Sequence, residues 1–440
     1  MSLAKRLASQ SSVIFAARIV GSGIIFLVQA AIARYWGAAV LGNYLLIVAI
    51  ANLIMVFMPL GFQTVGTYFV SEYRAKKDAK MLRKFIWRAY SHIGIMAIIV
   101  ALLILPISSF FDSIADIISI YWMPIVLLAF AIAIIYLNSA ILVGLKRPFA
   151  AFLTEALFRP LMLVASFILA LFVFSQSNAL MALLWGMSLS FMFLAILQFF
   201  IVIFSVAKIE DEVAPRNSEV KRWWRFAAPW VLIALATDFF FDIDLIILSG
   251  FLQPQELAIF GVSAKIFTLA AFGVVAVYAV VVPDIFEAEA NNDRAGFLQK
   301  IGEANLVAAG LSLILLIGIA IMGKFALGIF GEEFTQGLWP LVIMCSALLV
   351  RSIFGPASLV LSIYDRPYAS LPAVFVGLGS LVALNYLLVP AYGLMGAAIS
   401  ALVAITIWSI AQWYIALKIA KVDVSIFSAL RKKNSTLVKT

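Results

Sequence analysis

The stretch YWMPIVLLAFAIAIIYLNSAILV, residues 121–143, decides the fold class because its 23 residues contain no acidic or basic side chain. A helix that crosses the roughly 30 Å hydrocarbon core of a bilayer needs about 20 such residues. The whole chain has the same character: 65% of its 440 residues are apolar and 12% are charged, against about 25% charged in a soluble domain. The sequence therefore predicts an all-α polytopic membrane protein. It excludes a disulfide scaffold, since Cys345 is the only cysteine.

Apolar runs of similar length recur along the chain on both sides of this stretch, separated by charged or turn-forming residues. The first run is too long for the apolar region of a cleaved signal peptide, which has about 7–15 residues, so we interpret it as a retained span. We predict twelve membrane-spanning helices, at residues 12–34, 41–60, 86–110, 121–143, 149–174, 179–206, 227–249, 257–282, 303–323, 338–361, 369–388 and 394–417.

The basic residues are distributed in a way that indicates the orientation of these spans. Of the 31 Lys and Arg residues, 25 lie in loops and termini on the side of the N-terminus, and the opposite side has only Arg34 and Lys324. Because positively charged loops remain in the cytoplasm, we predict that both termini are cytoplasmic. The net charge of +9 is then mainly a result of topology. We expect membrane lipids as partners, and no nucleic acid.

Two short motifs recur at the spacing of a duplicated unit. RPFA at residues 147–150 follows the fourth span and RPYA at 366–369 follows the tenth, while FAA starts both the first span and the seventh. Parallel repeats of this kind are typical of transporters whose cargo site lies between the halves, so we expect a central cavity. We predict two parallel six-helix halves, residues 1–207 and residues 226–440. A cytoplasmic loop, residues 208–225, connects them.

Charged side chains inside the predicted spans need a partner or a water-filled cavity, because each costs about 2.5–3.5 kcal/mol at mid-helix. On the first span, Arg18, Ser22 and Gln29 lie on one helical face and form a polar stripe. Arg351 lies on the tenth span, where Gly355-Pro356 predicts a break or kink. Neither arginine has an acid nearby in the sequence, so we predict that both face a cavity.

The acids inside the spans offer a second kind of chemistry. Asp238 and Asp242 share a face of the seventh span by their i,i+4 spacing, and Lys265 on the eighth span is placed to reach one of them. We interpret these acids either as the site that exchanges a coupling ion or as structural partners of Lys265. Glu155 and Arg159 on the fifth span are also four residues apart, and mutual neutralisation is the simpler interpretation there.

Three stretches carry a resemblance to a known family: FAARIVGSGIIFLVQAAIARYWGAAVLGNY (15–44), PLGFQTVGTYFVSEYRAKKD (59–78) and DFFFDIDLIILSGFLQPQELAIFGVSAKI (238–266). They resemble polysaccharide-unit flippases of the Wzx type, in the multidrug/oligosaccharidyl-lipid/polysaccharide exporter (MOP) superfamily. The resemblance implies a bacterial inner-membrane flippase that moves an undecaprenyl-diphosphate-linked oligosaccharide from the cytoplasmic to the periplasmic leaflet.

The same resemblance implies alternating access coupled to an ion gradient, and polysaccharide assembly proteins as candidate partners. It also implies a cationic cavity that faces the sugar-diphosphate. The residues of this chain that match such a cavity are Arg18, Lys265, Arg159 and Arg351.

Two other functions stay open on the sequence alone. A drug or organic-cation antiporter of the same superfamily would use Asp238 and Asp242 as ligands, but Arg18 and Arg351 would then be out of place. A membrane enzyme, such as a polysaccharide polymerase or acyltransferase, would need a sizeable outer loop, whereas the longest one here, residues 324–337, has about 14 residues. The chain has no metal-ligand spacing, nucleotide-binding motif or Ser/His/Asp set, so we expect no enzyme, cofactor or metal.

Overall fold

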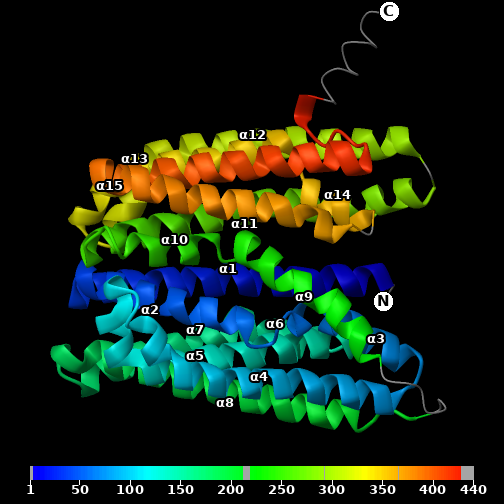
Figure 1. The fold of residues 1–440 in the computed structure, drawn as a ribbon, viewed down its shortest axis with the longest axis horizontal. Helices are drawn as coiled ribbons and strands as arrows, with labels where there is room; N and C mark the ends of the chain where they lie inside the picture. Colours follow the sequence, from blue (N-terminus) through cyan, green and yellow to red (C-terminus); the bar gives the residue numbers. More distant parts are fainter. Residues whose placement is uncertain (1–2, 212–218, 292, 365, 428–440) are drawn as a thin grey trace, which may run out of the picture. The chain divides into compact units, whose positions relative to one another are not determined.

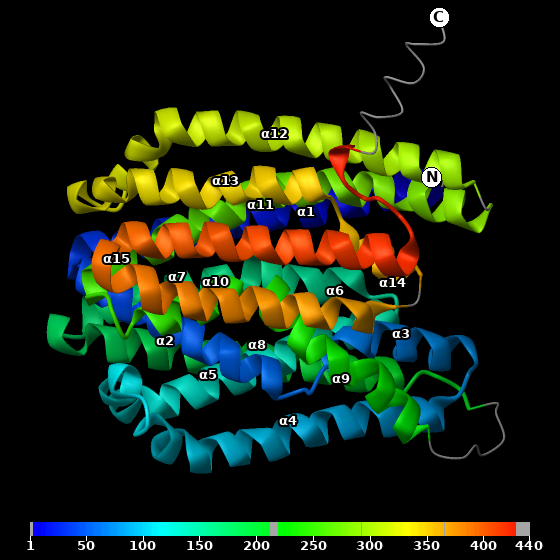
Figure 2. The ribbon, with the colours of Figure 1, turned by 45° about the horizontal axis from the view of Figure 1, so that its top comes forward.

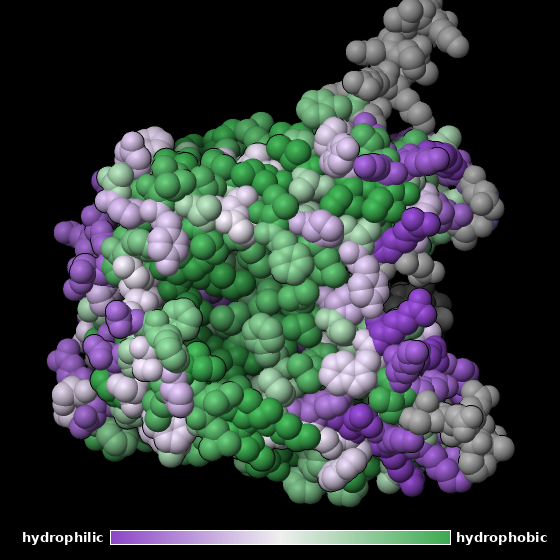
Figure 3. Space-filling model, in the orientation of Figure 1, coloured by the Kyte–Doolittle hydropathy of each residue, from purple (hydrophilic) through white to green (hydrophobic). Residues whose placement is uncertain are grey.

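The computed structural model describes residues 3–211, 219–291, 293–364 and 366–427, and the regular structure within them is all helical (Figure 1). The predicted fold class is therefore confirmed. The helices form two compact units, Met1–Ile246 and Ile247–Thr440. Hydrophilic side chains gather near the helix ends on the face shown in Figure 3, and the middle stretches are hydrophobic, as expected for helices in a bilayer.

The first unit is built around one buried helix. α5 packs against α2, α3, α4 and α8, and most of its apolar stretch is buried, whereas α4 leaves most of its stretch exposed. In chain order the elements are α1 (Leu3–Trp36), α2 (Ala38–Phe57), α3 (Phe62–Ala75), α4 (Ala79–Ser108), α5 (Asp112–Gly144), α6 (Pro148–Leu153), the π-helix η1 (Thr154–Phe158), α7 (Arg159–Val173), η2 (Gln176–Asn178), α8 (Ala179–Val206), α9 (Val220–Thr237) and α10 (Phe240–Leu248).

In the second unit α13 packs against α11, α12 and α15. Val422 and Val424, which follow the last helix, are buried in a cluster with Phe297 and Val360. The elements are α11 (Pro254–Ala290), α12 (Arg294–Gly328), η3 (Glu332–Gly337), α13 (Leu338–Phe354), α14 (Ala357–Ile363), η4 (Pro367–Ser370), α15 (Leu371–Ile415) and η5 (Ala416–Ala420).

Ten helices among the described residues are long and apolar enough to cross a membrane. One of these, Tyr368–Ala420, contains two predicted spans, because Gly393 interrupts its helical backbone with a φ of 52°. The interrupted pair of α9 and α10 forms a further span, the predicted seventh. The structure therefore agrees with the twelve predicted spans and their order.

The seventh span differs from the prediction because it is not continuous. α9 ends at Thr237 and α10 begins at Phe240, so Asp238 lies in the break between them. Thr237 Oγ1 donates to the carbonyl of Ile233 (3.0 Å), an arrangement that bends helices, and Asp and Phe are only modest helix formers. The prediction that Asp238 and Asp242 share one face of a continuous helix is therefore wrong.

The predicted interruption of the tenth span is confirmed. α13 ends at Phe354 and α14 begins at Ala357. Gly355 has a φ of 76°, which only glycine adopts readily, and a Cβ atom there would lie 2.0 Å from the carbonyl oxygen of Val424. Pro356 has no N–H with which to continue the helix.

The two recurring Arg-Pro motifs adopt the same turn. The backbone N–H of Arg147 donates to the carbonyl of Leu142 (2.8 Å), and that of Arg366 donates to Leu361 (2.9 Å). Each arginine precedes a helix that has proline in its first turn. The fifth and eleventh spans thus start in the same way, as expected of duplicated segments.

Helix α3 was not predicted. It is short and amphipathic, and its buried residues include Phe62, Phe69 and Tyr73. The polar residues between these positions interrupt the apolar run, so a search for spans overlooks it. α3 packs against α5, α4 and α9, and in Figure 2 it lies near the ends of α4 and α9.

Candidate functional site

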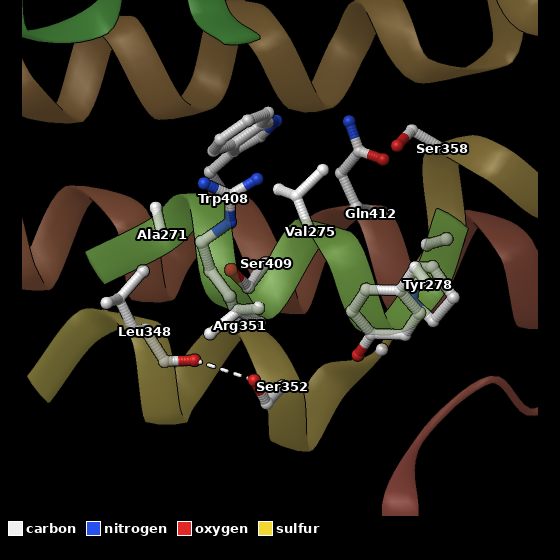
Figure 4. A pocket seen from close by; sticks show the side chains of 14 residues that line it. Ala271, Val275, Tyr278, Leu348, Arg351, Ser352, Ser358, Trp408, Ser409 and Gln412 are labelled. Carbon is white, nitrogen blue, oxygen red and sulfur yellow. Dashed lines mark hydrogen bonds between the residues drawn. The ribbon is translucent and has the colours of Figure 1, made fainter. Parts of the chain in front are cut away.

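A cavity of about 160 Å³ lies within the second unit, at the break between α13 and α14. Its walls come from α11, α13, α14 and α15, and it contains the predicted site residue Arg351 (Figure 4). The lining residues are Ala271, Val274, Val275, Tyr278, Leu348, Arg351, Ser352, Gly355, Pro356, Ala357, Ser358, Trp408, Ser409 and Gln412. None of them has a carboxylate.

Arg351 and Trp408 form the centre of this cavity. The guanidinium carbon of Arg351 lies 5.4 Å from the centre of the indole ring, a cation–π contact. Trp408 is 6% exposed, and its Nε1–H has no acceptor among the described residues. In Figure 4 this nitrogen lies on the side of the ring nearer Gln412. The cavity therefore contains a buried hydrogen-bond donor beside a positive charge.

The position of Trp408 is fixed by the segment of α15 that precedes the interruption at Gly393. A Cβ atom on Gly377 would lie 2.8 Å from Cβ of Trp408 and 3.0 Å from its Cγ. Only glycine therefore allows the indole to pack this closely against the first part of α15. With Gly377 on one side and Arg351 over the ring, few orientations remain for the indole N–H.

The other polar groups of the cavity are held by a hydrogen-bonded chain. The hydroxyl of Tyr278 donates to Oδ1 of Asn305 (3.0 Å), and Nδ2 of Asn305 donates to the carbonyl of Val424 (2.6 Å). Ser352 donates to the carbonyl of Leu348 (2.9 Å), which Figure 4 shows as a dashed line. The cavity thus has the positive charge of Arg351, the N–H of Trp408 and several hydroxyl groups, and no acid lines it. It is therefore suited to an anion with polar substituents.

In the first unit, Arg18 and Arg159 both lie against aromatic rings. The guanidinium carbon of Arg18 is 5.2 Å from the ring centre of Phe152, and that of Arg159 is 5.0 Å from Phe191 and 5.9 Å from Tyr136. Nε of Arg159 is buried and has no acceptor among the described residues. The two arginines are thus placed by rings of α6, α8 and α5 within the membrane-spanning part of the unit.

The π-helix η1 brings Glu155 into the same region. Pro160 lacks the N–H that would bond to the carbonyl of Ala156, and the freed carbonyl faces Gly21 of α1 so closely that a Cβ there would lie 1.8 Å from it. Glu155 interacts electrostatically with both Arg159 and Arg18. Glu155 therefore lies near both arginines, and its mutual neutralisation with Arg159 stays a prediction.

The remaining predicted residues have different surroundings. Asp242 accepts a hydrogen bond from Nδ2 of Asn52 (3.3 Å), and Asp238 is exposed in the break after α9. In the polar stripe of α1, Gln29 is 3% exposed and Ser22 is half-buried. Lys265 is half-buried on α11 in the second unit and does not line the cavity of Arg351.

Trp408, Gln412, Tyr278 and Glu155 were not among the predicted site residues. Trp408 and Gln412 are four residues apart in an otherwise apolar span, which is a signal of a polar helical face. No sequence pattern marks Tyr278, because its place in the cavity depends on the contact of α11 with α13.

A polar network joins α3 to the start of α9 at the cytoplasmic side predicted for these segments. Arg222 donates to Glu72 (2.8 and 3.1 Å) and to Glu219 (2.9 Å). The hydroxyl of Tyr73 donates to Glu219 (2.7 Å) and accepts from Nε1 of Trp223 (2.7 Å). Burial opposes ionisation of Glu72, but its hydrogen bonds to Arg222 and Lys76 outweigh burial and lower its pKa. This network fixes α9 on the first unit.

Residues 7–289 match the sequence model of a family described as polysaccharide biosynthesis protein. The fold is similar to that of an inward-facing multidrug resistance MATE family transporter of the MOP superfamily (TM-score 0.75, 14% identity, covering 91% of this chain and 95% of that one). It is also similar to the lipid II flippase MurJ in an inward closed conformation (TM-score 0.72, 15% identity, 97% and 91%).

A mutant of the Vibrio cholerae MATE transporter VcmN is a further similar structure (TM-score 0.58, 17% identity, 96% and 98%). At identities this low, the structural similarity establishes a shared fold alone. No curated protein matches the sequence. The family match extends over more than half of the chain and confirms the resemblance found in the sequence, so this multi-pass membrane protein belongs to the polysaccharide biosynthesis protein family.

Proposed function

We propose that this protein is a flippase that moves an undecaprenyl-diphosphate-linked oligosaccharide from the cytoplasmic to the periplasmic leaflet of the bacterial inner membrane. The observation that carries the proposal is the cavity of the second unit, where Arg351 and the N–H of Trp408 lie together without a lining carboxylate. The family match and the fold shared with the lipid II flippase MurJ support it.

The chemistry of the cargo explains why such a cavity is needed. A diphosphate and its sugars cannot enter hydrocarbon without losing their water, so the path must provide hydrogen bonds and opposite charge. A guanidinium forms two parallel hydrogen bonds to phosphate, and the indole N–H adds a third donor. Gln412 and Ser409 are suited to sugar hydroxyls, while the lipid chain remains in the bilayer.

The first unit contributes a second set of candidate ligands. Arg18 and Arg159 would bind phosphate, and Ser22 and Gln29 on α1 would bind sugar hydroxyls. Gln29 supports this role because its buried Oε1 has no donor among the described residues. Lys265 on α11 is a further candidate for the diphosphate.

Asp238 and Asp242 remain our candidates for coupling transport to a gradient of H⁺ or Na⁺. Asp242 has an amide partner in Asn52 (3.3 Å), which can hydrogen-bond to either protonation state of the carboxyl group. Asp238 lies in a helix break, where the backbone has room to move as the carboxyl group binds or releases an ion.

The proposal is tested by replacing Arg351. We expect Arg351→Ala to reduce polysaccharide export by about 100-fold at normal membrane abundance, since two charge-assisted hydrogen bonds are lost. Arg351→Lys should retain part of the activity because it keeps the charge but not the planar fork. Lys324→Ala, at an exposed residue outside the cavity, is the matched control. Full export by Arg351→Ala would exclude this role of the cavity.

A drug or organic-cation antiporter is the second candidate, and the fold shared with MATE transporters favours it. Such a transporter needs acids as ligands, which here are Asp238, Asp242 and Glu155. Proteoliposomes distinguish the two functions. Gradient-driven accumulation of ethidium by the purified protein would support the antiporter, whereas transfer of a fluorescent polyprenyl-diphosphate sugar between leaflets supports the flippase.

A further inference from the structure

A second cavity, an open groove of about 510 Å³, lies in the first unit between α4, α5 and α8. None of the charged residues described above lines it. Its walls are formed by small residues of α4 and large apolar residues of the other two helices, among them Gly94, Ala97, Ala101, Trp122, Phe130 and Trp185. Figure 2 shows α4 running along one edge of the ribbon, with α5 beside it.

The depth of this groove limits what can occupy it. All three helices span the membrane, and Gly94 lies midway along α4. A Cβ atom added at Gly94 would meet nothing within 4 Å, so the groove is open at this point. Since only hydrocarbon chains are abundant at mid-membrane depth, the natural occupant is a lipid chain.

The face of α4 that forms the groove continues toward the cytoplasmic side as a basic and aromatic stripe. Arg83, Trp87, Gly94 and Ala101 are separated by four, seven and seven residues, which keeps them within about 40° on a helix. Arg83 is exposed and Trp87 is 72% exposed. A cation beside an interfacial aromatic residue suits the phosphate of a lipid in the inner leaflet.

The opposite end of the groove has the opposite charge. α5 begins there with Asp112 and Asp116, both exposed, which repel an anionic headgroup from the outer leaflet. The lipid is therefore anchored at Arg83. From Arg83 to Ala101 the helix rises about 27 Å, which exceeds the roughly 15 Å that one leaflet contributes to the hydrocarbon core. An ordinary acyl chain in one leaflet ends near the middle, whereas a long isoprenoid chain continues along the groove.

We propose that this groove binds the isoprenoid chain of the lipid-linked substrate, with the phosphate at Arg83. The identity of the lipid rests on the flippase function proposed above. The site holds the substrate on the first unit by its lipid chain, separately from the arginines that bind the diphosphate during transport. It would therefore select for chain length and not for the sugar.

The test is a binding measurement on the full-length protein purified in detergent. Undecaprenyl phosphate and dioleoylphosphatidylglycerol are titrated separately, and bound lipid is counted by native mass spectrometry. Because a leucine side chain at residue 94 fills the groove and displaces several methylene contacts, we expect Gly94→Leu to weaken binding of undecaprenyl phosphate about tenfold. Dioleoylphosphatidylglycerol should bind weakly and equally to both proteins.

Gly310→Leu is the matched control, because Gly310 lies outside the groove on α12 and, like Gly94, has nothing within 4 Å of an added Cβ. It should bind undecaprenyl phosphate as the unmodified protein does. Ala97→Leu fills the same groove one turn further along and is used if Gly94→Leu fails to accumulate. Unchanged binding by a folded groove variant, or equal binding of the two lipids, would overturn the proposal.

Binding and transport are scored separately, so the two proposals fail in different ways. Loss of undecaprenyl phosphate binding in Gly94→Leu supports the groove even if the unmodified protein transfers no lipid-linked sugar between leaflets. Transfer by the unmodified protein together with unchanged binding in Gly94→Leu supports the flippase and rejects the groove.

Discussion

The arginine sites of the two units differ in what holds them in place. In the first unit, Gly21 of α1 packs against the carbonyl oxygen of Ala156, a backbone atom freed by the π-helix. In the second unit, Gly377 packs against the side chain of Trp408. An added Cβ would lie 1.8 Å from the backbone oxygen at Gly21 and 2.8 Å from Cβ of Trp408 at Gly377. The first site is therefore more tightly packed than the second.

The two sites also differ in charge. Arg159 and Arg18 have Glu155 nearby, and Asp242 lies elsewhere in the same unit. The cavity of Arg351 has no lining carboxylate. We therefore expect tighter anion binding in the second unit than in the first, and we expect the candidate coupling acids of the first unit to act on the ion gradient. Each variant below tests one side of this comparison.

The largest effect is expected from Gly21→Ala. The added Cβ would lie 1.8 Å from the carbonyl oxygen of Ala156, so α1 must move away from η1. Overpacking against backbone costs about 1–3 kcal/mol or more, and we expect most of the protein to be lost from the membrane fraction. Gly23→Ala is the matched control, because nothing lies within 4 Å of a Cβ there. Equal abundance of the two variants, measured by immunoblotting, would contradict a tightly packed first site.

Replacing Asp238 or Asp242, the candidate coupling acids, should affect transport without affecting folding. We expect Asp242→Asn to keep normal abundance, because an amide can still bond to Asn52, and to abolish the dependence of transport on an ion gradient. Asp238→Asn should act in the same direction. Proteoliposome flux with and without an imposed pH or Na⁺ gradient is the measurement. Gradient-dependent flux in both variants would leave these acids with a structural role only.

The spans, their order and the interruption at Gly355-Pro356 could be predicted because they follow from local features: apolar length, charge and backbone chemistry. Arg351 could be identified for the same reason, since a charge within a span needs a polar surrounding. Trp408 joins it only through the packing of α13 against α15, which no local pattern reveals.

Other features were missed because apolar length and charge do not reveal them. The break at Asp238 depends on a bent helix end, and α3 is stabilised by burying Phe62 and Phe69 in the first unit, not by being apolar enough to span. The π-helix depends on Pro160 and on the close approach of Gly21. For α3 and for the approach of Gly21 to Ala156, the consequence of the residue depended on a neighbour distant in the chain. At Asp238 the cause is local, the bond of Thr237 to Ile233, but apolar length and charge do not reveal it.

A smaller effect is expected at the second site, which is less tightly packed. Trp408→Phe keeps the aromatic ring under Arg351 but removes the N–H, so we expect diphosphate binding to weaken about tenfold, the value of one hydrogen bond to a charged group. Gly377→Ala should have a similar effect, because the added Cβ would lie 2.8 Å from Cβ of Trp408 and the segment that carries the indole must move. Isothermal titration of the purified protein with inorganic diphosphate measures this, and Trp339→Phe, an exposed tryptophan on the same helix as Arg351, is the control. Unchanged affinity in Trp408→Phe would show that its N–H does not bind the anion.

The smallest effect is expected at the network that fixes α9 on the first unit. Glu72→Gln removes a carboxylate whose partner Arg222 has about a third of its side chain exposed, so the loss of stability should be about 1 kcal/mol. Because the pKa of Glu72 is lowered in the folded protein, its contribution is complete above the ordinary pKa of glutamate, about 4.3, and is lost as the pH falls through the lower folded value. The melting temperatures of the unmodified protein and of Glu72→Gln should therefore differ by a few degrees at pH 7 and converge as the pH falls below the lowered pKa of Glu72. Glu210→Gln, at an exposed glutamate in the connecting loop that precedes α9, should melt like the unmodified protein. A difference in melting temperature for Glu72→Gln that persisted at low pH would mean that packing, and not charge, holds α9 in place.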